Sequence, residues 1–301
     1  MSQRPTDPAA TPLGKPRPAV FRALGKSDPP SQVEVDGDMY DLEVILKHDS
    51  WAATAIYKST ERRIVCKFNR KQWFFIIPLG WVGRWLGRRE ARLLTELAPI
   101  GNLPLLLGPV KIEGKVAPNA VARTFIPGHP LRWGELLDDA FLPRLKSMIE
   151  GMHARGVAYV DLHKPENIIV GDDAQPYLID FQISYRQPRG WWWRLFRPLW
   201  FLRILQQCDR YHLQKHVIRS RPNPLPEDET ELDRLRPWPI RVARFFGNRI
   251  RGCRRKLLVL LGIRRGKGLS RTESDPEDAV KRSMSHEGET QESTPAAGER
   301  H

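Results

Sequence analysis

Three polar residues flank two short apolar runs in the middle of the chain. Asp161 and Asn167 stand at or before the first run, N-I-I-V, and Asp180 follows the second, Y-L-I. Turn-forming residues at 171–176 separate the runs, which predicts a β-hairpin. Such a hairpin would bring Asn167 beside Asp180, with Asp161 on the loop just upstream. Mg²⁺ is usually held by one or two carboxylates together with substrate phosphates, so this oxygen-rich corner predicts a magnesium site.

This arrangement resembles the catalytic half of the protein-kinase-like superfamily, where an H-R-D-L-x-x-x-N loop and a later D-F-G share the work of phosphoryl transfer. Residues 159–161 (Y-V-D) stand in place of H-R-D, and residues 180–182 (D-F-Q) in place of D-F-G. The resemblance implies that Asp161 orients the acceptor hydroxyl as catalytic base. It also implies that Asn167 and Asp180 bind Mg²⁺.

The stretch departs from the kinase pattern at three places. Tyr159 and Val160 replace the His and Arg that precede the catalytic Asp. Five residues instead of four separate that Asp from the Asn, with His163 as the apparent extra residue, and Gln182 replaces the Gly of D-F-G. The alternative interpretation is an ordinary surface hairpin with scattered acidic residues.

An ion pair is predicted upstream, between a strand and a helix. Alternating and β-branched residues predict strands on both sides of a turn at 48–51 and a third strand at 63–69, which ends near Lys67. Residues 82–97 have helical periodicity, and Glu90 falls on their apolar face. A carboxylate there is costly unless it is paired, and Lys67 is its natural partner. The alternatives are a solvated lysine and a partly exposed glutamate at the edge of the stripe.

The resemblance extends to this region, because V-C-K at residues 65–67 is similar to the end of the kinase V-A-I-K motif. It implies that Lys67 grips the phosphates of ATP and that the Lys67–Glu90 pair is part of the catalytic machinery. The Gly-rich loop is absent, and the turn around Ser50 occupies its place, where backbone amides could reach a phosphate.

Two further strands are expected at residues 104–112 and 119–126, and a hinge at residues 126–128. If the analogy holds, backbone groups of three residues before the hinge bind adenine: Arg123, Thr124 and Phe125. A helix is expected over residues 133–154, leading to the catalytic loop.

After Asp180 the chain differs from protein kinases. Residues 190–207 contain tryptophans and arginines in place of an activation segment, and suit either an interfacial helix or a core helix with exposed arginines. By resemblance, Asp209 at the start of the next helix supports the catalytic loop from beneath. His212 and His216 are four residues apart, but without a third ligand they predict a satisfied pair and not a metal site.

Composition indicates an anionic partner. The 301-residue chain is 41% hydrophobic, carries a net charge of +14 and contains 10 tryptophans, most of them in arginine-rich segments. Tryptophan and arginine together suit a membrane–water interface, and the acid-free stretch at 240–265 predicts an amphipathic surface helix. Nucleic acid is the less favoured partner, because nothing resembles a recognition module. Three widely spaced cysteines and the lack of an apolar N-terminal signal favour a reducing, cytoplasmic location, peripheral on the inner face of the cytoplasmic membrane.

The sequence therefore predicts an α+β protein with a two-lobed protein-kinase-like fold: a small β-rich N-lobe with one main helix, and a mostly helical C-lobe. The expected segments are a disordered arm at 1–37, the N-lobe at 38–127, the C-lobe at 128–220, a linker with the basic helix at 221–268, and a disordered tail at 269–301.

The expected activity is ATP- and Mg²⁺-dependent transfer of a phosphoryl group to a hydroxyl. The chain resembles small bacterial lipopolysaccharide-core sugar kinases, which implies a membrane-proximal glycan or lipid-linked acceptor. Two alternatives stay open: a protein serine/threonine kinase, and an inactive pseudokinase that acts as a scaffold at the membrane surface.

Overall fold

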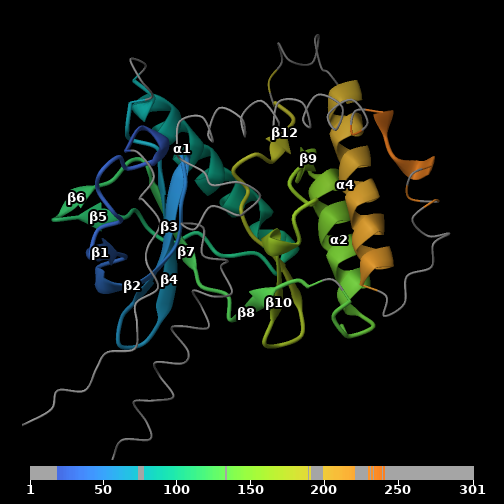
Figure 1. Ribbon diagram of the computed structural model, residues 1–301, viewed down its shortest axis with the longest axis horizontal. Helices are drawn as coiled ribbons and strands as arrows, with labels where there is room; N and C mark the ends of the chain where they lie inside the picture. The colour runs from blue at the N-terminus through green and yellow to red at the C-terminus, as the bar shows by residue number, and fades with distance from the viewer. Residues whose placement is uncertain are drawn as a thin grey trace, which may run out of the picture.

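The computed structural model describes residues 19–73, 78–132, 134–188, 190 and 199–220, together with residues 230, 232, 234–238 and 240. The expected tail at 269–301 and almost all of the expected linker and basic helix lie outside the described residues. The described part is a mixed α+β structure, in which an antiparallel sheet comes first and most of the helical structure follows (Figure 1).

Seven strands form one antiparallel sheet. They are β1 (Gln32–Val35), β2 (Asp38–His48), β3 (Ala52–Lys58), β4 (Arg63–Asn69), β5 (Lys111–Ile112), β6 (Lys115–Val116) and β7 (Ala120–Thr124). Their order across the sheet is β6-β5-β1-β2-β3-β4-β7. The strands predicted around the turn at 48–51 and at 63–69 are confirmed. The strand predicted at 104–112 is reduced to β5, and the one predicted at 119–126 ends at Thr124.

The predicted disordered arm at 1–37 is wrong over its last 19 residues, 19–37, which the structure describes. Residues Ala19–Phe21 form a short 3-10 helix, and β1 pairs with both β2 and β5. Val33 and Val35 are buried in the core on one face of the sheet. The strand forms because its alternating sequence, Q-V-E-V, buries every second side chain. The composition of the residues before it does not prevent this.

Helix α1 (Gly80–Leu97) crosses the sheet against β4 and β7 and begins two residues before the predicted start. Its buried face carries Leu93, Leu94 and Leu97, which join the core shared with the second helix. A short 3-10 turn at Ala98–Ile100 ends it.

In its described residues, the second half is built from two helices, a small three-stranded sheet and one further strand pair. These elements are β8 (Gly128–Pro130), α2 (Phe141–Ala154), β9 (Val157–Ala158), the 3-10 turn at Pro165–Asn167, β10 (Ile168–Gly171), β11 (Pro176–Leu178), β12 (Tyr185–Arg186) and α4 (Leu199–Arg219). Strand β10 lies between β8 and β11, and β12 pairs with β9. The hairpin predicted from the two apolar runs is confirmed, with Ile168 opposite Leu178.

Two helix boundaries differ from the prediction. The helix expected at 133–154 starts only at Phe141, because Gly134 has φ 73° and the Asp138 carboxylate accepts a hydrogen bond from the Ala140 amide at 3.1 Å. The helix expected to open at Asp209 begins ten residues earlier, at Leu199. Residues 191–198 of the tryptophan-rich segment lie outside the described part. No helix within the described ranges is long and apolar enough to cross a membrane.

Candidate functional site

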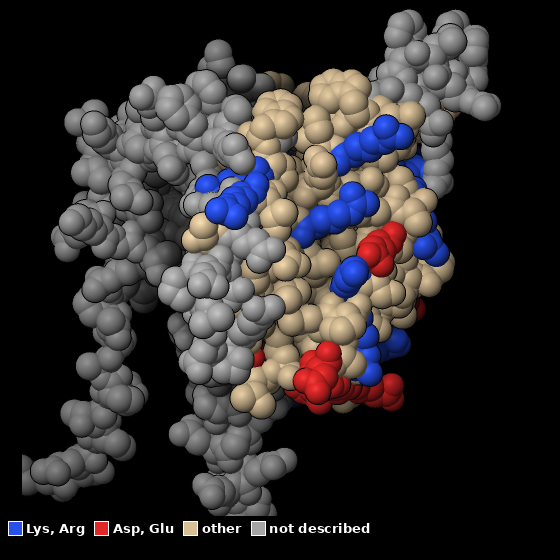
Figure 2. Space-filling model, turned by 90° about the vertical axis from the view of Figure 1, so that its right-hand side faces the viewer, with Lys and Arg blue, Asp and Glu red and all other residues tan. Residues whose placement is uncertain are grey.

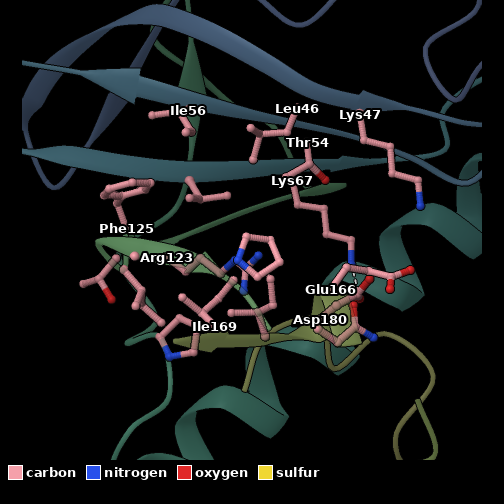
Figure 3. A pocket seen from close by; sticks show the side chains of 18 residues that line it. Leu46, Lys47, Thr54, Ile56, Lys67, Arg123, Phe125, Glu166, Ile169 and Asp180 are labelled. Carbon is pink, nitrogen blue, oxygen red and sulfur yellow. Dashed lines mark hydrogen bonds and ion pairs between the residues drawn. The ribbon is translucent and has the colours of Figure 1, made fainter. Parts of the chain in front are cut away.

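A cleft of about 270 Å³ lies between the sheet and the β10–β11 hairpin (Figure 3). Leu46, Ile56 and Val65 cover it from the side of the sheet, and Ile169 and Ile179 line it from the side of the hairpin. The walls are therefore apolar on two opposite sides, while charged groups lie at one end. Such a cleft suits a flat, partly apolar ligand with a charged tail.

The charged end of the cleft is built around the ammonium group of Lys67. Its Nζ lies 2.7 Å from Asp180 Oδ1 and 3.2 Å from Glu90 Oε2. The side chains of Lys67 and Glu90 are only 6% and 1% exposed, so this is a buried ion pair. The contact predicted between Lys67 and Glu90 is confirmed, and Asp180 joins it from the hairpin.

Lys67 and Asp180 stabilise each other's charged forms. Burial alone would raise the pKa of Asp180, but the Lys67 ammonium outweighs it and holds that pKa well below its usual range. Burial would likewise lower the pKa of Lys67, and the carboxylates of Asp180 and Glu90 raise it instead. Lys67 and Asp180 are therefore both charged at neutral pH.

Asp161 and Asn167 contact each other beside the cleft, which Asn167 lines and Asp161 does not. The Asn167 side-chain amide donates to Asp161 Oδ2 at 2.9 Å, and Lys164 Nζ lies 2.8 Å from the same oxygen. Asp161 Oδ1 lies 3.3 Å from His163 Nδ1, the ring of the extra loop residue. Burial lowers the pKa of His163 although Asp161 opposes the shift, so the ring is largely neutral at pH 7.

Asp209 fixes the loop that carries Asp161. Its fully buried carboxylate accepts hydrogen bonds from the backbone amides of Tyr159, at 2.7 Å, and Val160, at 2.8 Å. Its Oδ2 also lies 3.0 Å from His153 Nε2. Val160 has φ 71°, a conformation that strains a β-branched residue. The two hydrogen bonds from the backbone amides to Asp209 hold it in that conformation. The predicted support from beneath the loop is confirmed as a contact.

His212 and His216 do not form a metal site. Burial lowers the pKa of His212 to about 3 and that of His216 to about 4. His216 Nε2 lies 2.6 Å from the backbone carbonyl oxygen of Leu162, so its ring is neutral and supports the same loop. The pair was predicted at the surface, which is wrong for His216: its side chain is fully buried and contacts that carbonyl oxygen.

The donor atoms at this site fit a magnesium ion bound together with a ligand. The Asn167 amide nitrogen is engaged by Asp161, which leaves the amide oxygen as its ligating atom. Asp180 supplies a carboxylate, and both residues line the cleft. The described residues hold no group of three or more His, Cys, Asp or Glu side chains arranged for a metal. One carboxylate and one amide are sufficient for Mg²⁺ only where substrate phosphates complete its coordination.

The predicted cofactor-binding residues divide into two groups. Arg123, Thr124 and Phe125 line the cleft. Ser50 does not line it, and the predicted reach of the backbone amides of its turn to a phosphate stays a prediction. The Ser50 hydroxyl donates to the carbonyl oxygen of Phe21 at 3.0 Å, because the turn between β2 and β3 packs against the N-terminal segment.

The sequence prediction did not include Lys47 and Thr54 among the site residues. They are cross-strand partners on β2 and β3, and both line the cleft near Lys67 (Figure 3). The period-2 pattern of these strands could have identified them, since Thr54 is two residues from Ile56 and shares its face. The sequence does not show which face of these strands borders the cleft.

Two comparisons with known proteins gave no match. No protein-family model matches the chain, and no curated protein matches it.

Proposed function

We propose that the protein is a phosphotransferase with a two-lobed protein-kinase-like fold, which transfers the γ-phosphoryl group of ATP to a hydroxyl in the presence of Mg²⁺. The observation that carries the proposal is the cluster of Lys67, Glu90 and Asp180 at the charged end of an apolar cleft, with Asp161 and Asn167 beside it. Phosphoryl transfer is catalysed mainly by positioning and electrostatic stabilisation, and these residues offer both.

Each residue has a distinct part in the proposed reaction. The Lys67 ammonium, held by Glu90, binds phosphate oxygens of the nucleotide. Asn167 and Asp180 would hold Mg²⁺, which neutralises charge on the phosphates when it is bound. Asp161 orients the acceptor hydroxyl and takes its proton as the oxygen bonds to the γ-phosphorus and ADP leaves. The acceptor we propose is a membrane-proximal glycan of the lipopolysaccharide type.

A thermal-shift and turnover experiment tests this function. ATP with Mg²⁺ should raise the melting temperature of the full chain, and Asp180→Ala should abolish that shift. Asp161→Asn should retain the shift and lose ATP-dependent phosphorylation of membrane extract. Asp139→Asn makes the same chemical change at an exposed residue outside the cleft and should behave as wild type. A wild-type protein that binds no nucleotide with any divalent ion would refute the proposal.

A second candidate is an inactive scaffold, and one observation favours it. In the turn that replaces the Gly-rich loop, Asp49 Oδ1 accepts hydrogen bonds from the amides of Trp51 and Ala52, at 2.7 and 2.9 Å. These amides are engaged and do not offer a ready phosphate cradle. The two candidates differ in turnover: the scaffold binds nucleotide weakly or not at all, and Asp161→Asn then changes nothing.

We also propose that the protein binds the anionic surface of a membrane through the outer face of α1. Trp81 and Trp85 are 62% and 53% exposed, and three exposed basic residues share their face: Arg84, Arg88 and Arg92. The spacing of 3, 4, 7 and 11 residues from Trp81 places all five on one side of the helix. On the face presented in Figure 2, basic side chains are instead spread out, with acidic ones both among them and at the lower edge. The membrane proposal therefore rests on the five residues on the outer face of α1.

Sedimentation with liposomes tests the membrane proposal. Each basic group near an anionic surface contributes about 1 kcal/mol, so wild type should bind anionic vesicles at low salt and release them at high salt. Replacing Trp81 and Trp85 with serine should weaken the vesicle binding that persists at high salt. Leu136→Ser removes a 92% exposed leucine elsewhere and is the matched control. Equal binding to neutral and anionic vesicles would exclude the electrostatic contribution.

A further inference from the structure

Arg123 is buried in the wall of the cleft without partners for two of its donor atoms. The residue is 7% exposed, and its Nε and Nη1 atoms are fully buried with no hydrogen-bond partner among the described residues. Its side chain extends from β7 into the cleft (Figure 3). A buried donor that lacks an acceptor costs free energy, and more so when it is charged. The position therefore requires an explanation.

A second buried arginine shows how the fold satisfies such a group when its role is structural. Arg70 is 1% exposed, and its guanidinium donates to four backbone carbonyl oxygens, those of Val20, Ser50, Gln72 and Trp73, at 2.6 to 2.9 Å. Among the described residues, no corresponding set of acceptors surrounds Arg123. Because Arg123 is one of the residues that line the cleft, a ligand bound there could supply acceptors after a small rotation of the side chain.

The position of Arg123 defines which part of a ligand it meets. In the sheet, Arg123 lies opposite Val65, while Lys67, two residues further along β4, lies opposite Val121. Figure 3 shows the Arg123 side chain between Phe125 and the charged end at Lys67 and Asp180. Arg123 therefore lies between the apolar part of the cleft, where a nucleotide base would be held between Val65 and Ile169, and the charged end, where its charge helps to lower the pKa of Asp180.

We infer that Arg123 selects a purine that carries an oxygen at its 6-position, so that the preferred nucleotide is GTP or ITP over ATP. The inference rests on the proposed function and refines the identity of its nucleotide. Arginine forms its commonest specific base contact with guanine, through O6 and N7, because its fork of donors matches two neighbouring acceptors. Adenine presents an amino group at position 6, which is itself a donor and would face the guanidinium without forming a bond.

Titration calorimetry of the full chain with Mg²⁺ and GTP, ITP or ATP tests the inference. ITP and ATP form a close pair, since both lack the 2-amino group of guanine and differ at the 6-position and at N1. Wild type should bind ITP and GTP about 5- to 140-fold more tightly than ATP, the range that follows from about 1–3 kcal/mol for one bidentate base contact. Arg123→Met should remove this preference and leave ATP affinity nearly unchanged.

Three further variants separate the possible roles of the side chain. Arg123→Lys keeps the charge and loses the fork, so the preference for ITP should fall. Lys67→Met should weaken the binding of ITP and of ATP by the same factor, because Lys67 contacts the phosphates in the proposed function. Arg144→Met changes an exposed arginine on α2 and should preserve the wild-type ratio. The unliganded Arg123→Met protein should melt at or above the wild-type temperature, because it no longer buries unpaired donors.

The outcomes distinguish this inference from the function on which it rests. Tighter binding of ATP than of ITP by the wild type would overturn the inference and leave the kinase proposal standing. An Arg123→Met variant that loses ITP and ATP affinity equally would also overturn it, since the guanidinium would then act on phosphates. A wild type that binds no triphosphate would overturn both.

Discussion

The carboxylate of Asp209 should be one of the most important single groups for the stability of the loop that carries Asp161. It accepts two backbone hydrogen bonds, from Tyr159 and Val160, and contacts the His153 ring, all without solvent exposure. In Asp209→Ala the two amides lose their acceptor. An unsatisfied buried donor costs about 1–3 kcal/mol, so the substitution should lower the free energy of unfolding by about 2–6 kcal/mol.

The arrangement of the oxygens predicts a smaller effect for Asp209→Asn. Oδ2 accepts from Tyr159 and contacts His153, whereas Oδ1 accepts from Val160 alone. An asparagine that places its oxygen at the Oδ2 position keeps the first two contacts and turns its amino group toward the Val160 amide. The Val160 amide then faces a second donor in place of its acceptor, and the expected loss is smaller than in the alanine variant, which loses the Tyr159 and His153 contacts as well.

Urea unfolding followed by tryptophan fluorescence measures both losses. Glu150→Ala is the control, because Glu150 is exposed and its ion pair with Lys146 spans 3.9 Å at the surface. The control should change the free energy of unfolding by less than about 0.5 kcal/mol. The reasoning is refuted if Asp209→Ala costs less than about 1 kcal/mol, or if the alanine and asparagine variants are equally destabilised.

Three other changes test the site and its supports. Glu90→Gln should leave the fold intact, since Asp180 still pairs with Lys67, and should weaken Mg²⁺-ATP binding by about 1–3 kcal/mol in calorimetry; unchanged affinity would remove Glu90 from the site. The folded pKa of His216, about 4, lies below its unfolded value of 6.5, so unfolded chains take up a proton first. Stability should therefore fall as the pH drops from 6.5 to 4, by about 3 kcal/mol from this residue, and His216→Gln should flatten that part of the urea-midpoint profile. Gly128→Ala should lower the melting temperature, because Gly128 has φ 139° and an added Cβ would lie 2.2 Å from a carbonyl oxygen of β10; an unchanged melting temperature would mean that β8 can shift.

The sequence was most informative where the structure depends on neighbouring residues. The β10–β11 hairpin follows from two apolar runs and the turn between them, so Asn167 and Asp180 could be placed at its open end. The Lys67–Glu90 contact required only a strand, a helix and the cost of burying an unpaired carboxylate. Each of these predictions rests on a local pattern and one pairing rule.

The sequence was least informative where distant segments meet. Nothing near Ser50 indicates that its turn packs against residues 19–23, and the composition of the N-terminal segment concealed the alternation of β1. The side chain of Arg123 was also beyond prediction. An arginine on a strand is usually solvated, and its burial depends on helix α1 and the hairpin closing over one face of the sheet.

The charges in the cleft explain how an unliganded site can remain folded and still favour a ligand. Lys67 lies between Asp180 and Glu90, so one ammonium is shared by two carboxylates. A divalent ion alone would have to displace Lys67 from Asp180, and a triphosphate alone would bring negative charge toward that carboxylate. In the proposed function the two would bind together: the ion would replace Lys67 at Asp180, the phosphates would replace Asp180 at Lys67, and every charge would keep a partner. Arg123 differs from this cluster because nothing in the described protein satisfies its buried donors, and only a ligand with its own acceptors can do so.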